Sequence, residues 1–199
     1  MNIALGMFSG VLLLITLPNL FYVKNQLKAE AADYTFFDNI TKSSWLLKPV
    51  LGYFSDSFYP FHYRLKSYIL IFSVMMIVCC YMVSILPRDL YFFTIIVALI
   101  YFAVGFIDTQ AEGLTAVVTK MEGRIEDLKA QGGRAKEVDS NQNIGNFLMF
   151  RNLIRYIAIF LGGAMSDSVA IETIYLILGV PPIILMVYTL FFFTELKVS

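Results

Sequence analysis

Two pairs of like charges stand out in the second half of the sequence. Asp108 and Glu112 are four residues apart, and so are Arg151 and Arg155. Residues with this spacing lie on one face of a helix. A carboxylate beside a guanidinium group forms a charge-assisted hydrogen bond, and either group can also hold a charged solute. The chemistry predicted for these residues is therefore ion pairing or the lining of a substrate path.

The elements that carry these charges are two apolar stretches joined by a polar connection, residues 120–143. If each helix meets the connection at its end, Glu112 and Arg151 are both eight residues from it. Asp108 and Arg155 are both twelve residues from it. In an antiparallel helix pair, residues at equal distances lie at equal depth. We therefore predict a buried charge ladder in which Glu112 pairs with Arg151. Its second rung would join Asp108 to Arg155, and each rung is expected to form directly or through water.

The composition indicates that these helices lie in a membrane. Hydrophobic residues make up 58% of the 199 residues, charged residues make up 15%, and the mean hydropathy is +0.71. Soluble domains have roughly a quarter of their residues charged. A helix needs about 20 apolar residues to cross the hydrocarbon core. The predicted fold class is all-α, a polytopic membrane protein with six transmembrane helices in one domain. The expected spans are residues 3–23, 34–54, 68–86, 90–118, 144–165 and 170–193.

The second span has a polar face formed by Asp38, Lys42 and Lys48. Charges at bilayer depth are costly, so this face is expected to turn toward protein or water. Asp38 and Lys42 are four residues apart and are expected to neutralise each other. In the last span, Pro181 and Pro182 predict a kink. The polar connection is expected to begin with a short surface helix that ends at the following pair of glycines.

Other classes of function find little support in the residues. The 15 basic and 15 acidic residues balance, so no nucleic-acid partner is expected. Two adjacent cysteines, Cys79 and Cys80, and the single histidine, His62, do not predict a metal site. We find no Ser-His-Asp, Cys-His or glycine-rich phosphate-loop pattern, so neither an enzyme nor a cofactor is predicted. The expected partners are membrane lipids and other membrane proteins.

The basic residues predict an orientation in the membrane. Eight of them fall on one side of the predicted spans and three on the other. The side richer in Lys and Arg corresponds to the cytoplasm. Both termini are therefore expected on the cytoplasm-equivalent side, which is the matrix if the membrane is an organellar inner membrane.

Residues 44–70, SWLLKPVLGYFSDSFYPFHYRLKSYIL, contain a specific pattern. A Trp and a Lys-Pro pair are followed by Gly-x-x-Ser-Asp and by a proline-containing loop that ends in basic residues. The pattern consists of Trp45, Lys48, Pro49, Gly52, Ser55, Asp56, Pro60, Arg64 and Lys66. It resembles the signature of the folate–biopterin transporter family of the major facilitator superfamily. This resemblance implies one six-helix bundle of the two that make up a family member.

The resemblance gives the loop after the second helix a possible role. Such loops are thought to latch two bundles together, and the residues concerned are Gly52, Ser55, Asp56, Arg64 and Lys66. Gly52 is expected to let the helix end pack closely against a neighbour. The alternative is a solvated hairpin that follows the positive-inside bias. The family resemblance favours descent of this loop from a latch loop. It does not imply that the latch operates in this chain.

Two functions remain open. Alternating access requires one bundle to rock against another. For a single bundle, the favoured interpretation is a transporter-derived accessory subunit of a larger membrane complex, with an organelle such as the mitochondrion as the expected location. The alternative is a half-size transporter of folate, pterin or a related small anion, which works as a dimer or with a second six-helix bundle. The charge ladder would lock the bundle in the first case and line the path in the second.

Overall fold

The computed structural model describes residues 12–58, 63, 65–85, 89–130, 140–166 and 168–192, and these contain helices and no strand. In chain order the helices are η1 (Leu12–Ile15), α2 (Thr16–Phe21), η2 (Tyr22–Gln26), α3 (Ala31–Leu46), α4 (Lys48–Ser57), α5 (Lys66–Ile85), α6 (Leu90–Ala130), α7 (Ser140–Ser166), α8 (Ile171–Leu178) and α9 (Val180–Phe191). η1 is a 3₁₀-helix and η2 a π-helix. The all-α class is confirmed for this part of the chain.

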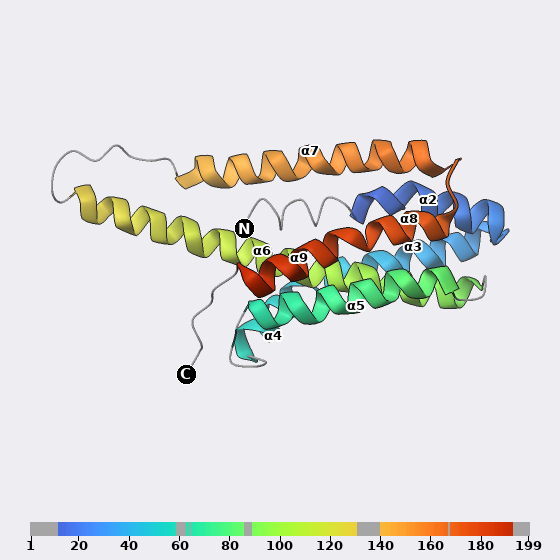
Figure 1. Cartoon of the computed structure of the whole chain (residues 1–199), viewed down its shortest axis with the longest axis horizontal. Helices are drawn as coiled ribbons and strands as arrows, with labels where there is room; N and C mark the ends of the chain where they lie inside the picture. The colour runs from blue at the N-terminus through green and yellow to red at the C-terminus, as the bar shows by residue number, and fades with distance from the viewer. Residues whose placement is uncertain are drawn as a thin grey trace.

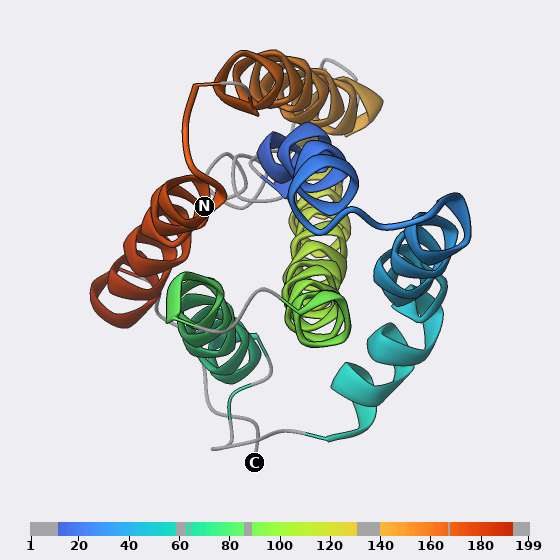
Figure 2. The same ribbon diagram turned by 90° about the vertical axis from the view of Figure 1, so that its right-hand side faces the viewer.

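The helices run roughly parallel to one long axis, as Figure 1 shows. α6 is central: it packs against α5, α3, α4 and α7. The view along the axis shows α6 between α5 on one side and α3 on the other (Figure 2). α7 packs against η1 and α2, while α8 and α9 pack against α5.

Buried aromatic and branched side chains hold this arrangement together. Phe93 of α6 lies at the centre of the larger core and stacks on Phe37 with ring centroids 5.7 Å apart. Its ring also contacts Tyr22 at 4.8 Å. A second cluster forms farther along α6, where Phe106 stacks on Phe72 at 4.2 Å. Aromatic pairs of this kind stabilise a core by about 0.5–1.5 kcal/mol beyond the burial of their area.

The predicted count of six transmembrane helices is not confirmed. Among the described residues, three helices are long and apolar enough to cross a membrane: Lys66–Ile85, Leu90–Gly113 and Ile171–Phe191. These correspond to the third, fourth and sixth expected spans. The first expected span is described only from Leu12 onward.

The second expected span, residues 34–54, is not one continuous helix. It divides at Leu47 into α3 and α4. Pro49 explains the division, because proline lacks the N–H of a helical hydrogen bond and its ring clashes with the preceding turn. The sixth span divides in the same way at Gly179, two residues before Pro181. The break lies beside the proline pair at which the kink was predicted.

The polar connection also differs from the prediction. α6 does not end near residue 118; it continues to Ala130 as one helix of 41 residues. The expected separate surface helix is therefore the end of α6. At about 1.5 Å per residue, this helix is far longer than the hydrocarbon core is thick. The glycine pair expected to end it lies outside the described residues, which resume at α7.

Many large apolar side chains lie on the outside of the helices. Leu46, Phe160 and Phe191 are among the most exposed, at 81%, 75% and 77% of their area. Contiguous apolar surface of this kind is unfavourable in water and favourable in lipid. Together with the three apolar helices, it indicates an integral membrane protein.

Candidate functional site

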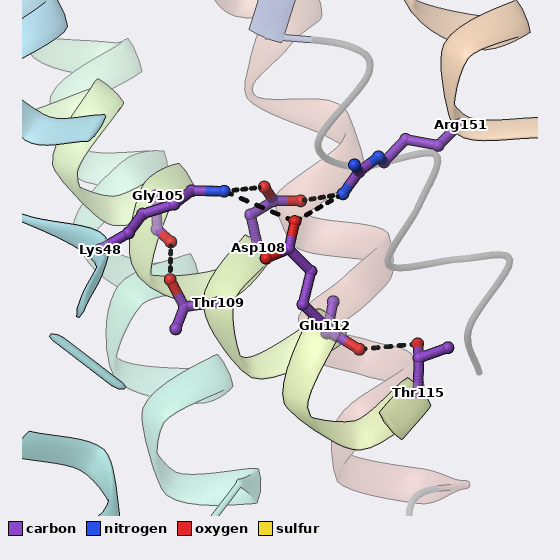
Figure 3. A network of polar contacts seen from close by, with 8 residues as sticks. Lys48, Gly105, Asp108, Thr109, Glu112, Thr115 and Arg151 are labelled. Atoms are coloured by element: carbon purple, nitrogen blue, oxygen red, sulfur yellow. Dashed lines mark hydrogen bonds and ion pairs between the residues drawn. The ribbon is translucent and has the colours of Figure 1, made fainter. Parts of the chain in front are cut away.

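Four charged side chains from three helices meet beside α6. Lys48 donates to Asp108 from one side, and Arg151 approaches from the other (Figure 3). Arg151 Nη1 lies 2.8 Å from Glu112 Oε1 and 3.4 Å from Asp108 Oδ1. Lys48 Nζ lies 3.7 Å from Glu112 Oε1. We call these four residues the charge cluster.

The members of the charge cluster differ in their access to solvent. The Asp108 side chain is 1% exposed, whereas the Glu112 side chain is 46% exposed. Arg151 and Lys48 are intermediate, at 11% and 22%. A buried carboxylate is tolerated when it is paired and hydrogen-bonded. Asp108 meets that requirement through two cations, so two acids and two bases neutralise each other within the chain.

The break after α3 explains how Lys48 reaches this cluster. Lys48 is the first residue of α4, directly before Pro49. Its ammonium also lies 4.4 Å from the centroid of the Trp45 ring on α3, which is a cation–π contact. On α6, the Thr109 hydroxyl donates to the carbonyl of Gly105 within the same turn as Asp108 (Figure 3). The break and the stacking contact direct Lys48 toward α6.

The predicted charge ladder is present in part. Glu112 and Arg151 form the expected ion pair. A direct second rung is not formed, because Asp108 pairs with Lys48 and Arg151 and not with Arg155. Equal depth in two antiparallel helices predicts pairs between those two helices only. It leaves out a third helix, α4, that lies beside α6. Lys48 supplies the cation that was expected from Arg155.

The second-helix polar face is also divided. Asp38 and Lys42 form the expected pair, with Oδ2 and Nζ 2.7 Å apart. Lys48, predicted on the same face, belongs instead to the charge cluster. Lys42 and Lys48 are six residues apart, and this spacing does not place two side chains on one face of a helix. That spacing was the signal in the sequence that could have separated the two lysines.

An open pocket of about 440 Å³ lies next to the charge cluster. Its lining residues are Leu13, Thr16, Lys42, Trp45, Tyr101 and Arg155. They come from η1, α2, α3, α6 and α7. Trp45 connects the two regions, because it lines the pocket and contacts Lys48 of the cluster. We call this space the cationic pocket, after Lys42 and Arg155.

Arg155 differs from the other basic residues near the site. It forms no ion pair with any residue that the structure describes. Its Nε, like that of Arg151, is buried without a hydrogen-bond partner there. A buried guanidinium N–H without a partner is energetically costly. The pocket therefore presents a cation with which no carboxylate of the described residues forms an ion pair. Sequence reasoning placed Arg155 in the ladder and missed the pocket.

The predicted latch residues are partly described. Ser55 is buried in α4 and donates to the carbonyl of Gly52 at 2.8 Å. A Cβ on Gly52 would meet Thr109 Cγ2 at 3.6 Å, an ordinary contact, so the close packing expected there is not found. Asp56 lies in the last turn of α4 and not in a loop. Lys66 begins α5 and donates to the carbonyl of Leu190 at 3.4 Å. Arg64 lies outside the described residues.

The described residues contain no group of three or more His, Cys, Asp or Glu side chains that could hold a metal ion. Cys79 and Cys80 are both buried in α5 and are free thiols. The charged side chains and aromatic rings of the site offer ion pairing and ring stacking.

Comparison with protein-family models identifies the relationship. Residues 9–197 match the model of the BT1 family. The chain belongs to the BT1 family. This is the folate–biopterin transporter family, so the resemblance predicted from residues 44–70 is confirmed. Searches of curated proteins and of solved structures gave no match. Membership in BT1 indicates a transporter-derived membrane protein.

Proposed function

We propose that this BT1 protein forms one wall of a transport path for an aromatic anion of the folate or pterin type. The cationic pocket is the observation that carries this proposal. It combines two basic side chains, Lys42 and Arg155, with two aromatic ones, Trp45 and Tyr101. The pocket would bind a solute and let it pass, without catalysing a reaction.

The chemistry of the pocket suits such a ligand. A guanidinium group binds a carboxylate through two parallel hydrogen bonds. Arg155 has this capacity free, because no described acid pairs with it. Trp45 and Tyr101 offer flat surfaces against which a heterocyclic ring can stack. A pocket of about 440 Å³ lies within the range of ordinary small-molecule sites.

The exposed polar groups suggest a second bundle. The side chains of Lys42 and Glu112 are 61% and 46% exposed, although both lie on helices that the proposal places in the membrane. Charges at that depth require water or a polar protein surface. A second six-helix bundle facing α3, α6 and α7 would enclose a water-filled path between the two halves. In this arrangement the helices of the chain form one six-helix bundle of the major facilitator type.

The second candidate function is an accessory subunit of a larger membrane complex in an organelle. The charge cluster favours it, since two acids and two bases compensate each other without a ligand. In that case the same polar face would bind another protein. For either function, the positive-inside bias supports termini on the cytoplasm-equivalent side.

Transport by the purified chain tests the proposal. The full chain is reconstituted into liposomes, and the uptake of radiolabelled folate is followed over time. We expect saturable uptake, and we expect Arg155→Gln to lower the initial rate at least tenfold, since charged hydrogen bonds contribute about 1.5–3 kcal/mol. Lys24→Gln is the matched control, because Lys24 is an exposed basic residue of η2 away from the pocket. Absence of folate flux, with isolation of the chain in a stable multiprotein complex, would favour the accessory role.

A further inference from the structure

The two cations of the pocket differ in what already neutralises them. Arg155 has no ion-pair partner among the described residues. Lys42 has one, because Asp38 Oδ2 lies 2.7 Å from its Nζ, one helical turn away on α3. Asp38 is not itself a lining residue of the pocket. An anion that enters the pocket therefore finds one available cation and one that is occupied.

We propose that Asp38 is an internal competitor for Lys42 and thereby sets the charge selectivity of the pocket. A ligand with one carboxylate binds Arg155 and leaves the Asp38–Lys42 pair intact. A ligand with two carboxylates must also displace Asp38 from Lys42 in order to use both cations. This inference rests on the proposed function and assigns a role to a residue that would not touch the ligand.

The exposure of the pair makes this exchange feasible. The side chains of Lys42 and Asp38 are 61% and 31% exposed. Asp38 can therefore remain hydrated after it loses Lys42, and an exposed ion pair of this spacing is weak. Asp108 provides the contrast, because its side chain is 1% exposed and would be left charged in an apolar surrounding. Three acids pair with a lysine in this region, and Asp38 is the one whose lysine lines the pocket.

The size of the effect follows from the strength of such pairs. Exposed ion pairs contribute about 0.2–1 kcal/mol, which corresponds to a change of up to about fivefold in a dissociation constant. Removing the charge of Asp38 should tighten binding of a dicarboxylate by about two- to fivefold. Binding of a monocarboxylate with the same rings should not change, because it does not use Lys42.

Folate and pteroate provide the two probes, since they share their ring system and differ in carrying two carboxylates and one. Equilibrium dialysis with the full chain in lipid nanodiscs gives the dissociation constant of each. We expect Asp38→Asn to tighten folate binding and to leave pteroate binding unchanged. Lys42→Gln should weaken folate binding, and Asp38→Asn should have no further effect in that background. Asp33→Asn is the control on the same helix, because asparagine retains the oxygen that accepts the Glu30 N–H.

The outcomes separate this inference from the proposed function. If the wild-type chain binds folate and Asp38→Asn leaves its affinity unchanged, the competitor role is wrong while the pocket remains an anion site. Equal tightening of folate and pteroate would also contradict it, since that result indicates a general effect of the negative charge. If the wild-type chain binds neither probe, the proposed function fails and the inference fails with it.

Discussion

The charge cluster and the cationic pocket are neighbouring regions that each contain one lysine and one arginine, yet their electrostatics differ. α7 contributes one arginine to each, Arg151 to the cluster and Arg155 to the pocket, one helical turn apart. Arg151 is compensated by two carboxylates, whereas Arg155 has no ion pair within the described residues. A charged group at bilayer depth thus stabilises the fold where the chain itself supplies the counter-charge. Where the chain does not, the group is available to a ligand.

The largest effect is expected at Asp108, the most buried member of the cluster. Asp108→Asn removes the carboxylate that both Lys48 and Arg151 share, and leaves two cations with Glu112 alone. Breaking a buried pair in this way costs about 3–5 kcal/mol. We expect a correspondingly lower free energy of unfolding for the full chain in detergent, measured by denaturant titration and circular dichroism.

The matched control for this prediction is Asp38→Asn, which removes a carboxylate from an exposed pair. The exposed pair contributes about 0.2–1 kcal/mol, so its loss should change stability little. Equal losses in the free energy of unfolding for the two variants would show that burial does not determine how much each acid contributes to stability. The comparison between the two regions would then lose its physical basis.

The next effect concerns the wall between α7 and η1. A Cβ added to Gly162 would lie 2.1 Å from the carbonyl oxygen of Leu14, so the backbones must move apart. Leu13 and Thr16, which are close to Leu14 in the chain, line the cationic pocket together with Arg155. Gly162→Ala should cost about 1–3 kcal/mol of stability through overpacking and should also weaken folate binding.

Gly113→Ala provides the control for the glycine prediction, because no described atom outside its own helix neighbourhood lies within 4 Å of the added Cβ. Alanine favours a helix over glycine by about 1 kcal/mol, so this variant should be as stable as the wild type or more stable. If Gly162→Ala behaves like Gly113→Ala, α7 and η1 do not make the close contact on which the pocket wall depends.

The sequence predicted the cluster better than the pocket, for reasons that particular residues make clear. Glu112 and Arg151 were found because depth in an antiparallel helix pair can be counted along the chain. Lys48 was assigned to the wrong group because the count assumed a straight second helix. Pro49 marks the break that redirects it, and a proline in an apolar run is a visible signal.

Other features could not be read from residue patterns. The pocket combines side chains of helices that are distant in sequence, so its lining depends on how η1, α3, α6 and α7 pack. The length of α6 was underestimated because hydropathy marks the edge of the membrane and not the end of a helix. α6 continues through polar residues until Ala130.

The third prediction compares the replacement of each arginine of α7 by glutamine. Arg155→Gln should weaken folate binding about tenfold, since it removes the uncompensated cation, and should leave the free energy of unfolding nearly unchanged. Arg151→Gln should do the reverse, because it leaves Asp108 and Glu112 without their shared guanidinium. Equilibrium dialysis and denaturant titration of both variants make the test. If Arg155→Gln destabilises the chain as much as Arg151→Gln does, Arg155 is a structural residue and the pocket is not a ligand site.

The smallest effect is expected at Glu112, where the cluster meets solvent. Its Oε1 lies 2.8 Å from Arg151 Nη1, but the side chain is 46% exposed, so water compensates for much of the lost charge in Glu112→Gln. Glutamine also retains an oxygen that can accept the arginine N–H. We expect a loss of about 0.5–1 kcal/mol in denaturant titration. This loss should shrink in 1 M salt, where the Debye length is about 3 Å. A loss that equals that of Asp108→Asn and persists in salt would make Glu112 the principal counter-charge, and exposure would then fail to rank the two acids of a single cluster.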